Sequence, residues 1–337
     1  MTENQPPSPD RFHDTVNAYR ESAAIKGAIE LELFTEIAAG AQTVSEIASA
    51  CKASERGIRI LCNQLVAMEY LEKVDDKYHL APDSEVFLVK TSPAYMGDIV
   101  FFLLDPFFIQ DIGNVAQVVR DGTIDTSKSS NEPEHPMWVA FARAMSGLQA
   151  HQAELVSELI KVDSNKAVRA LDIASGSGLF GVTLARKNEN VSVRAVDWPN
   201  VLEVATENAE KAGVADRHSG IAGSAFDVDF DGQYDIILLP NFLHHFNEET
   251  CTDFYRRLKA HLADDGKIYT VEFVTNEDGV SPAFAAGFAF HMLRQTEYGD
   301  AYTVAKLEKM NNDAGLKVDA VIAVGDTPST LLVSSHA

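Results

Sequence analysis

Cysteine is scarce in this chain of 337 residues, which contains only Cys51, Cys62 and Cys251. The three are odd in number and widely spaced, and no two of them form a C-x-x-C pair. A disulfide framework needs paired cysteines, and a structural zinc site commonly uses C-x-x-C pairs. The composition argues against both, so we expect no metal site. It also favours a reducing compartment, which predicts a cytoplasmic protein.

Basic side chains are the second shortage. Lys and Arg number 28 against 50 Asp and Glu, which gives a formal net charge of −22. Nucleic-acid binding depends on a basic face that contacts phosphates, and anionic membrane surfaces attract basic segments in the same way. The charge therefore disfavours nucleic acid and membrane as partners. Because acidic residues occur throughout the chain, we interpret them as a general solvated surface.

Long apolar runs are missing as well. The first residues are polar, and the apolar run Ile99–Leu104 ends at Asp105-Pro106. A membrane-spanning helix needs about 20 apolar residues and a signal peptide needs an apolar core, so we expect neither. The hydrophobic fraction of 46% is nevertheless ample for a core. At roughly 100–200 residues per domain, the length predicts two or three domains.

The first part of the chain has the pattern of a winged-helix-like domain after a disordered tail at residues 1–10. The spacing predicts, in order, a helix over 11–33, a helix opened by the capping box Thr43–Glu46, a helix from Ser54, and β-like runs at 70–74 and 77–80. Residues 43–90 contain six basic and eight acidic side chains. This balance disfavours DNA binding. We therefore interpret residues 11–95 as a packing or dimerisation domain.

Residues 96–160 are mostly helical in pattern and rich in Phe and Met. The stretch 121–136 within them predicts a loop. The plain interpretation of the aromatic residues is helix packing.

Strands alternate with helices from about residue 161 onward. The predicted strands are Val168–Ile173, Val191–Val196, Arg217–Ala222, Tyr234–Leu239, Lys267–Val274, Val318–Val324 and Thr330–Ser334. Helices between the earlier strands imply right-handed crossovers and a mostly parallel, doubly wound sheet. The last two strands are separated by only residues 325–329, so they must pair antiparallel. The sequence thus predicts an α/β fold over 161–337, with a Rossmann-like sheet closed by a C-terminal antiparallel hairpin.

A glycine-rich turn follows the first of these strands. Gly176, Gly178 and Gly181 fit the G-x-G-x-x-G pattern between a strand and a helix, and Asp197 ends the next strand. Glycines let the backbone approach a ligand, and an acid at the end of the second strand can bind both hydroxyls of a ribose. The pattern predicts a nucleoside-type site.

Asp172, in the strand before this turn, bears on which nucleoside binds. An ionised carboxylate there would oppose the pyrophosphate of NAD and would tolerate a cationic cofactor without phosphate, such as S-adenosylmethionine. The alternative is an acid that caps the turn. Two patterns favour a dehydrogenase instead: Tyr302-x-x-x-Lys306 and the Asn-rich stretch 311–315. Both lie late in the chain, and a helix start and a helix end explain them more simply.

His244 and His245 follow the strand at 234–239. The carboxyl ends of strands carry the chemistry in doubly wound sheets, and a histidine can act as a base near neutral pH. A metal site would need both histidines together with Glu248 or Glu249. Adjacent side chains rarely point the same way, which disfavours it. A purely structural histidine pair is the remaining alternative.

Several short segments resemble one enzyme family. Residues 243–251 read Leu-His-His-Phe-Asn-Glu-Glu-Thr-Cys, against a family pattern of Leu or Cys followed by His-Asp-Trp-x-Asp-Glu-x-Cys. Residues 270–272, Thr-Val-Glu, resemble its Val-Ala-Glu strand, while residues 141–145 and Met292-Leu293 resemble the walls of its acceptor pocket. Over residues 11–337 the chain is similar to the small-molecule O-methyltransferases of the caffeic acid and acetylserotonin type and their bacterial relatives.

The resemblance implies a homodimer formed by the N-terminal domain, a helical cap over a small-molecule acceptor at 96–160, and a catalytic domain at 161–337. That domain would bind S-adenosylmethionine and release S-adenosylhomocysteine. His244 falls on the catalytic base and Glu272 on a glutamate that orients it. The cofactor-binding residues expected are Asp172, Gly176, Gly178, Asp197, Trp198, Ser224, Ala225, Phe226, Pro240 and Asn241. The acceptor pocket is expected to contain Phe141, Met145, His245, His291 and Met292.

The chain departs from the family pattern at five positions. The first family glycine is Ala174, the acid that meets the adenine is Ser224, and the lysine near the cofactor is Pro240. The acid after the base is His245, and a second orienting glutamate is Ala301, beside Asp300. We expect these changes to preserve the fold and the class of cofactor.

Three other interpretations stay open at this stage. The first is an NAD(P)-dependent oxidoreductase. The second is a relative that binds the cofactor but catalyses a different reaction. The third is a winged-helix regulator that senses a ligand.

Overall fold

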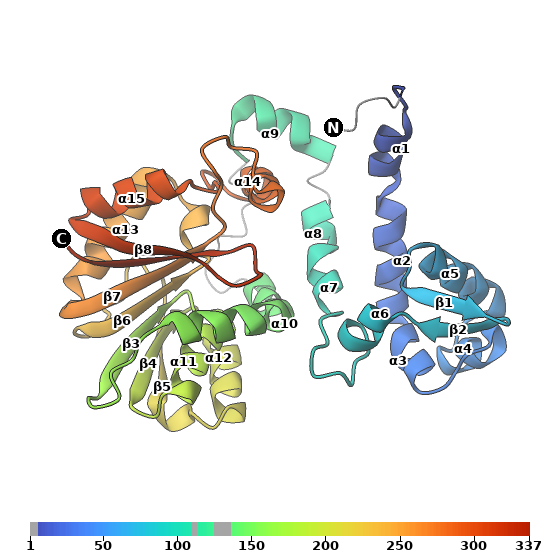
Figure 1. Ribbon diagram of the computed structural model, residues 1–337, viewed down its shortest axis with the longest axis horizontal. Helices are drawn as coiled ribbons and strands as arrows, with labels where there is room; N and C mark the ends of the chain where they lie inside the picture. Colours follow the sequence, from blue (N-terminus) through green and yellow to red (C-terminus); the bar gives the residue numbers. More distant parts are fainter. Residues whose placement is uncertain (1–5, 110–112, 125–135) are drawn as a thin grey trace. The chain divides into compact units, whose positions relative to one another are not determined.

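A computed structural model describes residues 6–109, 113–124 and 136–337. The chain separates into two compact units, Met1–Ile109 and Gln110–Ala337, each shown in Figure 1. The finer division into a cap and a catalytic domain stays a prediction. The predicted loop at 121–136 lies largely outside the described residues. No helix in the described ranges is long and apolar enough to cross a membrane.

The first unit has the predicted order of helices followed by a hairpin. Its elements are α1 (Asp10–Asn17), α2 (Tyr19–Glu30), α3 (Leu33–Ala38), α4 (Val44–Ala50), α5 (Glu55–Ala67), β1 (Leu71–Val74), β2 (Lys77–Leu80), α6 (Pro82–Phe87), α7 (Ile99–Leu103) and α8 (Pro106–Ile109). The capping box is present: Thr43 Oγ1 accepts from Glu46 N, and the Glu46 carboxylate accepts from Thr43 N. Strands β1 and β2 pair antiparallel.

The helix predicted over 11–33 is interrupted at Ala18, between α1 and α2. Just before the break, Thr15 Oγ1 donates to Arg11 O, and Asn17 Nδ2 donates to His13 O. Side chains that bond back to carbonyls of the preceding turn compete with the backbone ladder and bend helices. The hydrophobic spacing continues across this break, which is why periodicity alone predicted one helix.

The second unit is built on one sheet with the strand order β5-β4-β3-β6-β7-β9-β8. Its strands are β3 (Val168–Ile173), β4 (Val191–Asp197), β5 (His218–Ala222), β6 (Tyr234–Pro240), β7 (Leu262–Glu272), β8 (Leu316–Ala323) and β9 (Thr330–His336). Pairing is parallel from β5 to β7, and β9 runs antiparallel to both β7 and β8. The predicted fold class, including the closing hairpin, is confirmed.

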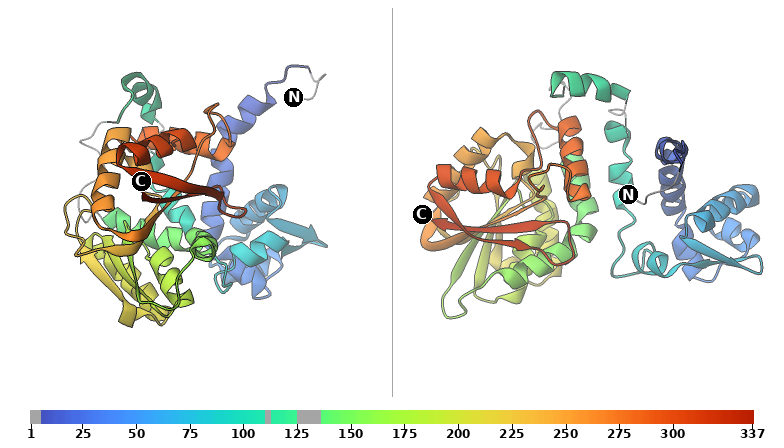
Figure 2. Two further views of the ribbon diagram at one scale, coloured as in Figure 1. Left: turned by 60° about the vertical axis from the view of Figure 1, so that its left-hand side comes forward. Right: turned by 45° about the horizontal axis from the view of Figure 1, so that its top comes forward.

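Helices cover both faces of this sheet. The helices of this unit are α9 (Val115–Asp121), α10 (Pro136–Leu159), α11 (Leu179–Lys187), α12 (Pro199–Lys211), α13 (Glu248–Ala260), α14 (Ala283–Gln295) and α15 (Val304–Asp313). Helices α10 to α12, coloured green to yellow, pack on one face, and α13 and α15, coloured orange to red, pack on the other (Figures 1 and 2). The two apolar layers fix the strands, so the loops at their carboxyl ends meet at one edge of the sheet.

Candidate active site

The glycine-rich turn joins β3 to α11 through left-handed backbone. Ala174, Gly176 and Gly178 have φ values of +48°, +56° and +74°. A Cβ on Gly178 would lie 2.8 Å from Ala205 Cβ, so glycine is needed there for α11 and α12 to approach. Ala174 takes the same type of backbone despite its side chain, at a cost of about 1–2 kcal/mol. The departure at 174 therefore keeps the shape of the turn.

Asp197 ends β4 beside this turn. Its Oδ2 accepts from Gly176 N at 2.8 Å, and its Oδ1 accepts from Trp198 N at 2.7 Å. Burial raises the pKa of this carboxyl to about 6, against the two backbone hydrogen bonds, which lower it. Each carboxylate oxygen has a further lone pair, so Asp197 can still accept from two hydroxyls of a ligand.

A cavity of about 380 Å³ opens over the turn, within the second unit. Most of its walls are apolar or aromatic, and no Lys or Arg occurs among the residues that line it in the described part of the chain. The lining residues are Trp138, Phe141, Ala174, Gly176, Val196, Asp197, Trp198, Val201, Gly223, Ser224, Ala225, Phe226, Asp227, Asn241, Phe242, His245 and Phe246. Seven of the ten cofactor residues expected from the sequence are therefore brought together around one space.

The other three expected cofactor residues, Asp172, Gly178 and Pro240, do not line this cavity. Asp172 is completely buried, and its Oδ2 accepts from Gly181 N at 3.0 Å, at the start of α11. Burial raises the pKa of Asp172 to about 8. A raised pKa disfavours the ionised form of Asp172, so the charge argument that used an ionised Asp172 gains no support from the structure.

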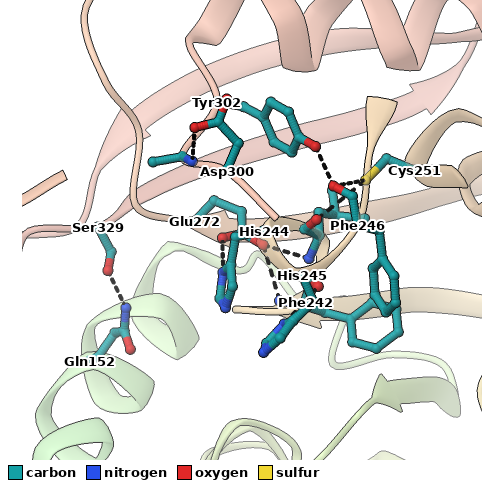
Figure 3. A network of polar contacts seen from close by, with 12 residues as sticks. Gln152, Phe242, His244, His245, Phe246, Cys251, Glu272, Asp300, Tyr302 and Ser329 are labelled. Atoms are coloured by element: carbon teal, nitrogen blue, oxygen red, sulfur yellow. Dashed lines mark hydrogen bonds and ion pairs between the residues drawn. The ribbon is translucent and has the colours of Figure 1, made fainter. Parts of the chain in front are cut away.

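His244 and Glu272 form a buried pair at the carboxyl ends of β6 and β7 (Figure 3). His244 Nδ1 lies 2.6 Å from Glu272 Oε2, and the two residues are 5% and 2% exposed. Glu272 Oε1 accepts from the backbone N–H groups of Phe242, at 3.0 Å, and Leu243, at 2.8 Å. A carboxylate only accepts, so Nδ1 carries the hydrogen and Nε2 of His244 has a free lone pair.

His245 lies beside His244 and lines the cavity. The ring centroids of His244 and His245 are 4.3 Å apart. Burial, the neighbouring His244 and His291 lower the pKa of His245 to about 3, although a hydrogen bond to Phe242 O opposes the shift. His245 is therefore a neutral polar group in the wall of the cavity.

Helix α14 brings further aromatic side chains to His244. The centroid of the Phe288 ring lies 4.8 Å from that of the His244 ring and 6.1 Å from that of the His291 ring. Met292 is buried, and Met145 is half-buried, but neither lines the cavity. Sequence reasoning did not place Phe288, Trp138, Phe242 or Phe246 in the site. Phe242 and Phe246 flank the histidines along the chain, and Trp138 stood out in the aromatic stretch 96–160 but was interpreted as helix packing.

The side chain of Asp300 does not reach His244. Its Oδ1 accepts from Ala301 N at 2.8 Å, and Oδ2 lies 4.0 Å from Lys306 Nζ. Ala301 itself is buried. Glu272 is thus the one carboxylate bonded to His244 among the described residues. No group of three metal-ligating side chains occurs in this part of the chain either.

Two family models match the sequence. One, described as an O-methyltransferase domain, matches residues 134–317. The other, described as an O-methyltransferase dimerisation domain, matches residues 13–90. Together they span both compact units.

Individual proteins are similar over nearly the whole chain. A 3-hydroxy-5-methyl-1-naphthoate 3-O-methyltransferase of Streptomyces sahachiroi is 26% identical, with 91% of this chain and 89% of the relative covered. A solved structure from Nostoc punctiforme, described as a candidate O-methyltransferase, is 42% identical with a TM-score of 0.92, covering 98% and 99% of the two chains. Human N-acetylserotonin methyltransferase, solved with S-adenosylmethionine, shares the fold at 19% identity, with a TM-score of 0.85 and full coverage of both chains.

Proposed function

The chain belongs to the family of S-adenosylmethionine-dependent O-methyltransferases, and we propose that it methylates a hydroxyl of a small aromatic acceptor with His244 as the general base. The observation that carries the proposal is the 2.6 Å contact between His244 and Glu272, next to His245, which lines the cavity. It leaves the Nε2 lone pair of a buried histidine free to remove a proton.

The cavity fits the cofactor of this family. When bound, S-adenosylmethionine supplies a methyl group on a positively charged sulfur, and the product is S-adenosylhomocysteine. Asp197 would accept hydrogen bonds from the ribose hydroxyls. Because Gly176 has no side chain, its backbone would leave room for the methionine part of the cofactor. Trp198 and Phe226 would flank the adenine. Ser224, Ala225 and Asn241 also line this space. Asn241 Oδ1 is buried and has no partner among the described residues, so it is available to a donor on the ligand.

The role proposed for His244 is proton removal. A phenol has a pKa of about 10 and is mostly neutral at pH 7, so a base is useful. His244 Nε2 would take the phenolic proton, which typically contributes about 10²–10⁴ in rate. Glu272 would keep the ring in one orientation and stabilise the imidazolium that forms. The proposal is therefore that His244 is the base and that Glu272 is the carboxylate that orients it.

An aromatic and largely uncharged acceptor is the proposal for the substrate. Its support is the apolar lining, the absence of cationic side chains from that lining, and the phenyl rings around His244. Phe141 and His245 would contact the acceptor at the cavity, while Met145, His291 and Met292 would back the pocket. The naphthoate that the Streptomyces relative methylates is also an aromatic compound.

A homodimer formed by the first unit is the proposal for the assembly. The dimerisation model matches residues 13–90. Helix α1 exposes Phe12 and Val16, and α2 exposes Tyr19, each by more than half of its surface. Exposed apolar side chains gathered on neighbouring helices are typical of association surfaces.

The substitution His244→Ala tests the base. We expect nearly normal binding of S-adenosylmethionine by calorimetry and a loss of about 10²-fold or more in turnover, measured as a +14 Da product from a panel of phenols. His151→Ala is the matched control, because His151 is a highly exposed histidine of the same unit paired only with Asp326. Unchanged turnover in His244→Ala would remove His244 from this role.

A further inference from the structure

The loop that carries the base is held by a second segment besides Glu272. Residues 299–302 run along the loop at 243–246, and they make two hydrogen bonds to it (Figure 3). Asp300 N donates to His244 O at 3.0 Å, and the Tyr302 hydroxyl donates to Phe246 O. The carbonyls on both sides of His245 are therefore fixed by the same short segment, which we name the anchoring segment (residues 299–302).

The fit between this segment and the base is close enough to require glycine. A Cβ on Gly299 would lie 2.3 Å from His244 O and 2.3 Å from Thr296 Oγ1. Real Cβ contacts are longer than this, so any side chain at 299 must displace the backbone of His244. The φ of Gly299 does not lie in the left-handed region, so space, rather than backbone conformation, is the reason for glycine.

The anchoring segment is itself tied to the strand that carries Glu272. Thr275 lies three residues beyond Glu272, and its N–H donates to Tyr302 O at 3.1 Å. Thr275 Oγ1 donates to Ala301 O at 3.2 Å, and Thr275 forms a parallel bridge with Thr303. Tyr302, Ala301 and Thr275 are all buried. One continuous framework thus holds the ring of the base through Glu272, its carbonyl through Asp300 N, and the carbonyl of Phe246 through Tyr302.

We infer that Tyr302 is a positioning residue for the base, and that its hydroxyl aims His244 by fixing the Phe246 carbonyl. The inference rests on the proposed role of His244. Glu272 alone restrains the ring at one atom, Nδ1, and the side chain at 301 offers no second carboxylate. Cys251 supports the same loop, since its Sγ lies 3.3 Å from Leu243 O. When the backbone of the loop at 243–246 is also fixed, Nε2 of His244 can point in only one direction.

The test compares two buried tyrosines that each lose one hydroxyl. In Tyr302→Phe the bond to the loop disappears. In Tyr255→Phe the bond to Thr270 Oγ1, 2.9 Å in length, disappears from the same apolar core without touching the loop. We expect Tyr302→Phe to lower kcat for a weakly acidic phenol about tenfold, since small misplacements of a reacting group are costly. Binding of S-adenosylmethionine should stay within about twofold of the parent value. We expect Tyr255→Phe to lower the melting temperature by about as much as Tyr302→Phe does. Its kcat should stay near the parent value.

A second acceptor separates positioning of the base from general loosening. A nitrophenol, assayed above its own pKa, is already ionised and needs no base. We therefore expect both Tyr302→Phe and His244→Ala to lose much less turnover with the nitrophenol than with the weakly acidic phenol. Equal losses with the two acceptors in Tyr302→Phe would overturn the inference. If His244→Ala loses turnover and Tyr302→Phe does not, the inference fails and the proposed function stands. If His244→Ala itself keeps full turnover, the proposed function fails.

Gly299→Ala provides an independent variant that leaves Tyr302 intact. The control is Gly287→Ala on α14, where an added Cβ meets nothing within 4 Å. Gly299→Ala should show the same dependence on the acceptor as Tyr302→Phe, and Gly287→Ala should behave as the parent. Parent-like kcat in a folded Gly299→Ala protein would contradict the close fit on which the inference depends.

Discussion

Protonation of the partly buried Asp197 carboxyl links ligand binding in the cavity to pH. Burial raises its pKa to about 6, and its oxygens are already bonded to Gly176 N and Trp198 N. Hydroxyl donors on a ligand bind the ionised form better than the protonated one. Ligand binding therefore favours loss of a proton from Asp197 in the range around its pKa.

This linkage predicts weaker cofactor binding in acid. The affinity for S-adenosylmethionine should be highest well above the pKa of Asp197. It should fall as the pH drops through about 6, by about tenfold between pH 7 and pH 5. Calorimetric titration with S-adenosylmethionine at the two pH values measures it. Asp197→Asn is the control, because an amide does not titrate: its affinity should be lower and nearly independent of pH. A parent protein that binds equally well at both values would contradict the assignment of Asp197 to the ribose.

At the scale of elements, the site depends on how closely helices approach the β3–α11 turn. Gly178 begins α11 in the left-handed conformation, and its α-carbon faces Ala205 of α12. The same helices form the apolar layer on one face of the sheet. The turn is thus set by packing between α11 and α12 as well as by its own backbone.

Two glycine variants separate these contributions. Gly178 and Gly213 have φ values of +74° and +70°, but only Gly178 has a close neighbour. We expect Gly213→Ala to destabilise the protein by about 1–2 kcal/mol through its backbone alone. Gly178→Ala should cost about 1–3 kcal/mol more because of overpacking, and it should weaken cofactor binding. Urea unfolding of both variants checks this. Equal losses would show that α12 does not constrain the turn.

At the scale of the whole molecule, the cavity and the exposed apolar helices belong to different units. The cavity and the His244–Glu272 pair lie in the second unit, whereas the exposed apolar residues of α1 and the start of α2 lie in the first. The net charge of −22 does not distinguish the units, since acidic side chains occur in both. Association through the first unit is therefore best tested by removing apolar contacts rather than charges.

The proposed homodimer predicts twice the chain mass of 36.8 kDa by light scattering at micromolar concentration. Val16→Asp should shift the protein towards the monomer, because a buried unpaired charge opposes association. Val74→Asp is the control: Val74 has nearly the same exposure, 53% against 55%, but lies on the β1 strand of the hairpin. A monomeric parent protein, or equal effects of the two variants, would argue against an interface on α1.

The sheet could be predicted from the sequence more completely than the site. Strand and helix positions in the second unit followed from alternating apolar periods, and the closing hairpin followed from the short connection at 325–329. The pairing of His244 with Glu272 was implied by a resemblance over a few residues and stays a proposal in function, although the structure brings the two together. From its position in the sequence, Asp172 was expected to bind the cofactor. In the structure it is buried, and its carboxyl accepts a hydrogen bond from Gly181 N.

The sequence by itself determined what depends on neighbours along the chain: the periods of the strands, the capping box at Thr43, the glycine turn and the acid at Asp197. Only the tertiary structure decided which distant residues meet. Phe288 and Tyr302 reach the loop at 243–246 from segments 44 and 56 residues beyond His244 and Phe246. No local pattern marks Phe288, and the Tyr302-x-x-x-Lys306 pattern pointed to a dehydrogenase instead. The physical reason is that burial and hydrogen-bond partners are set by the packing of layers. That packing also raises the pKa of both Asp172 and Asp197, and it holds the imidazole of His244 in one orientation.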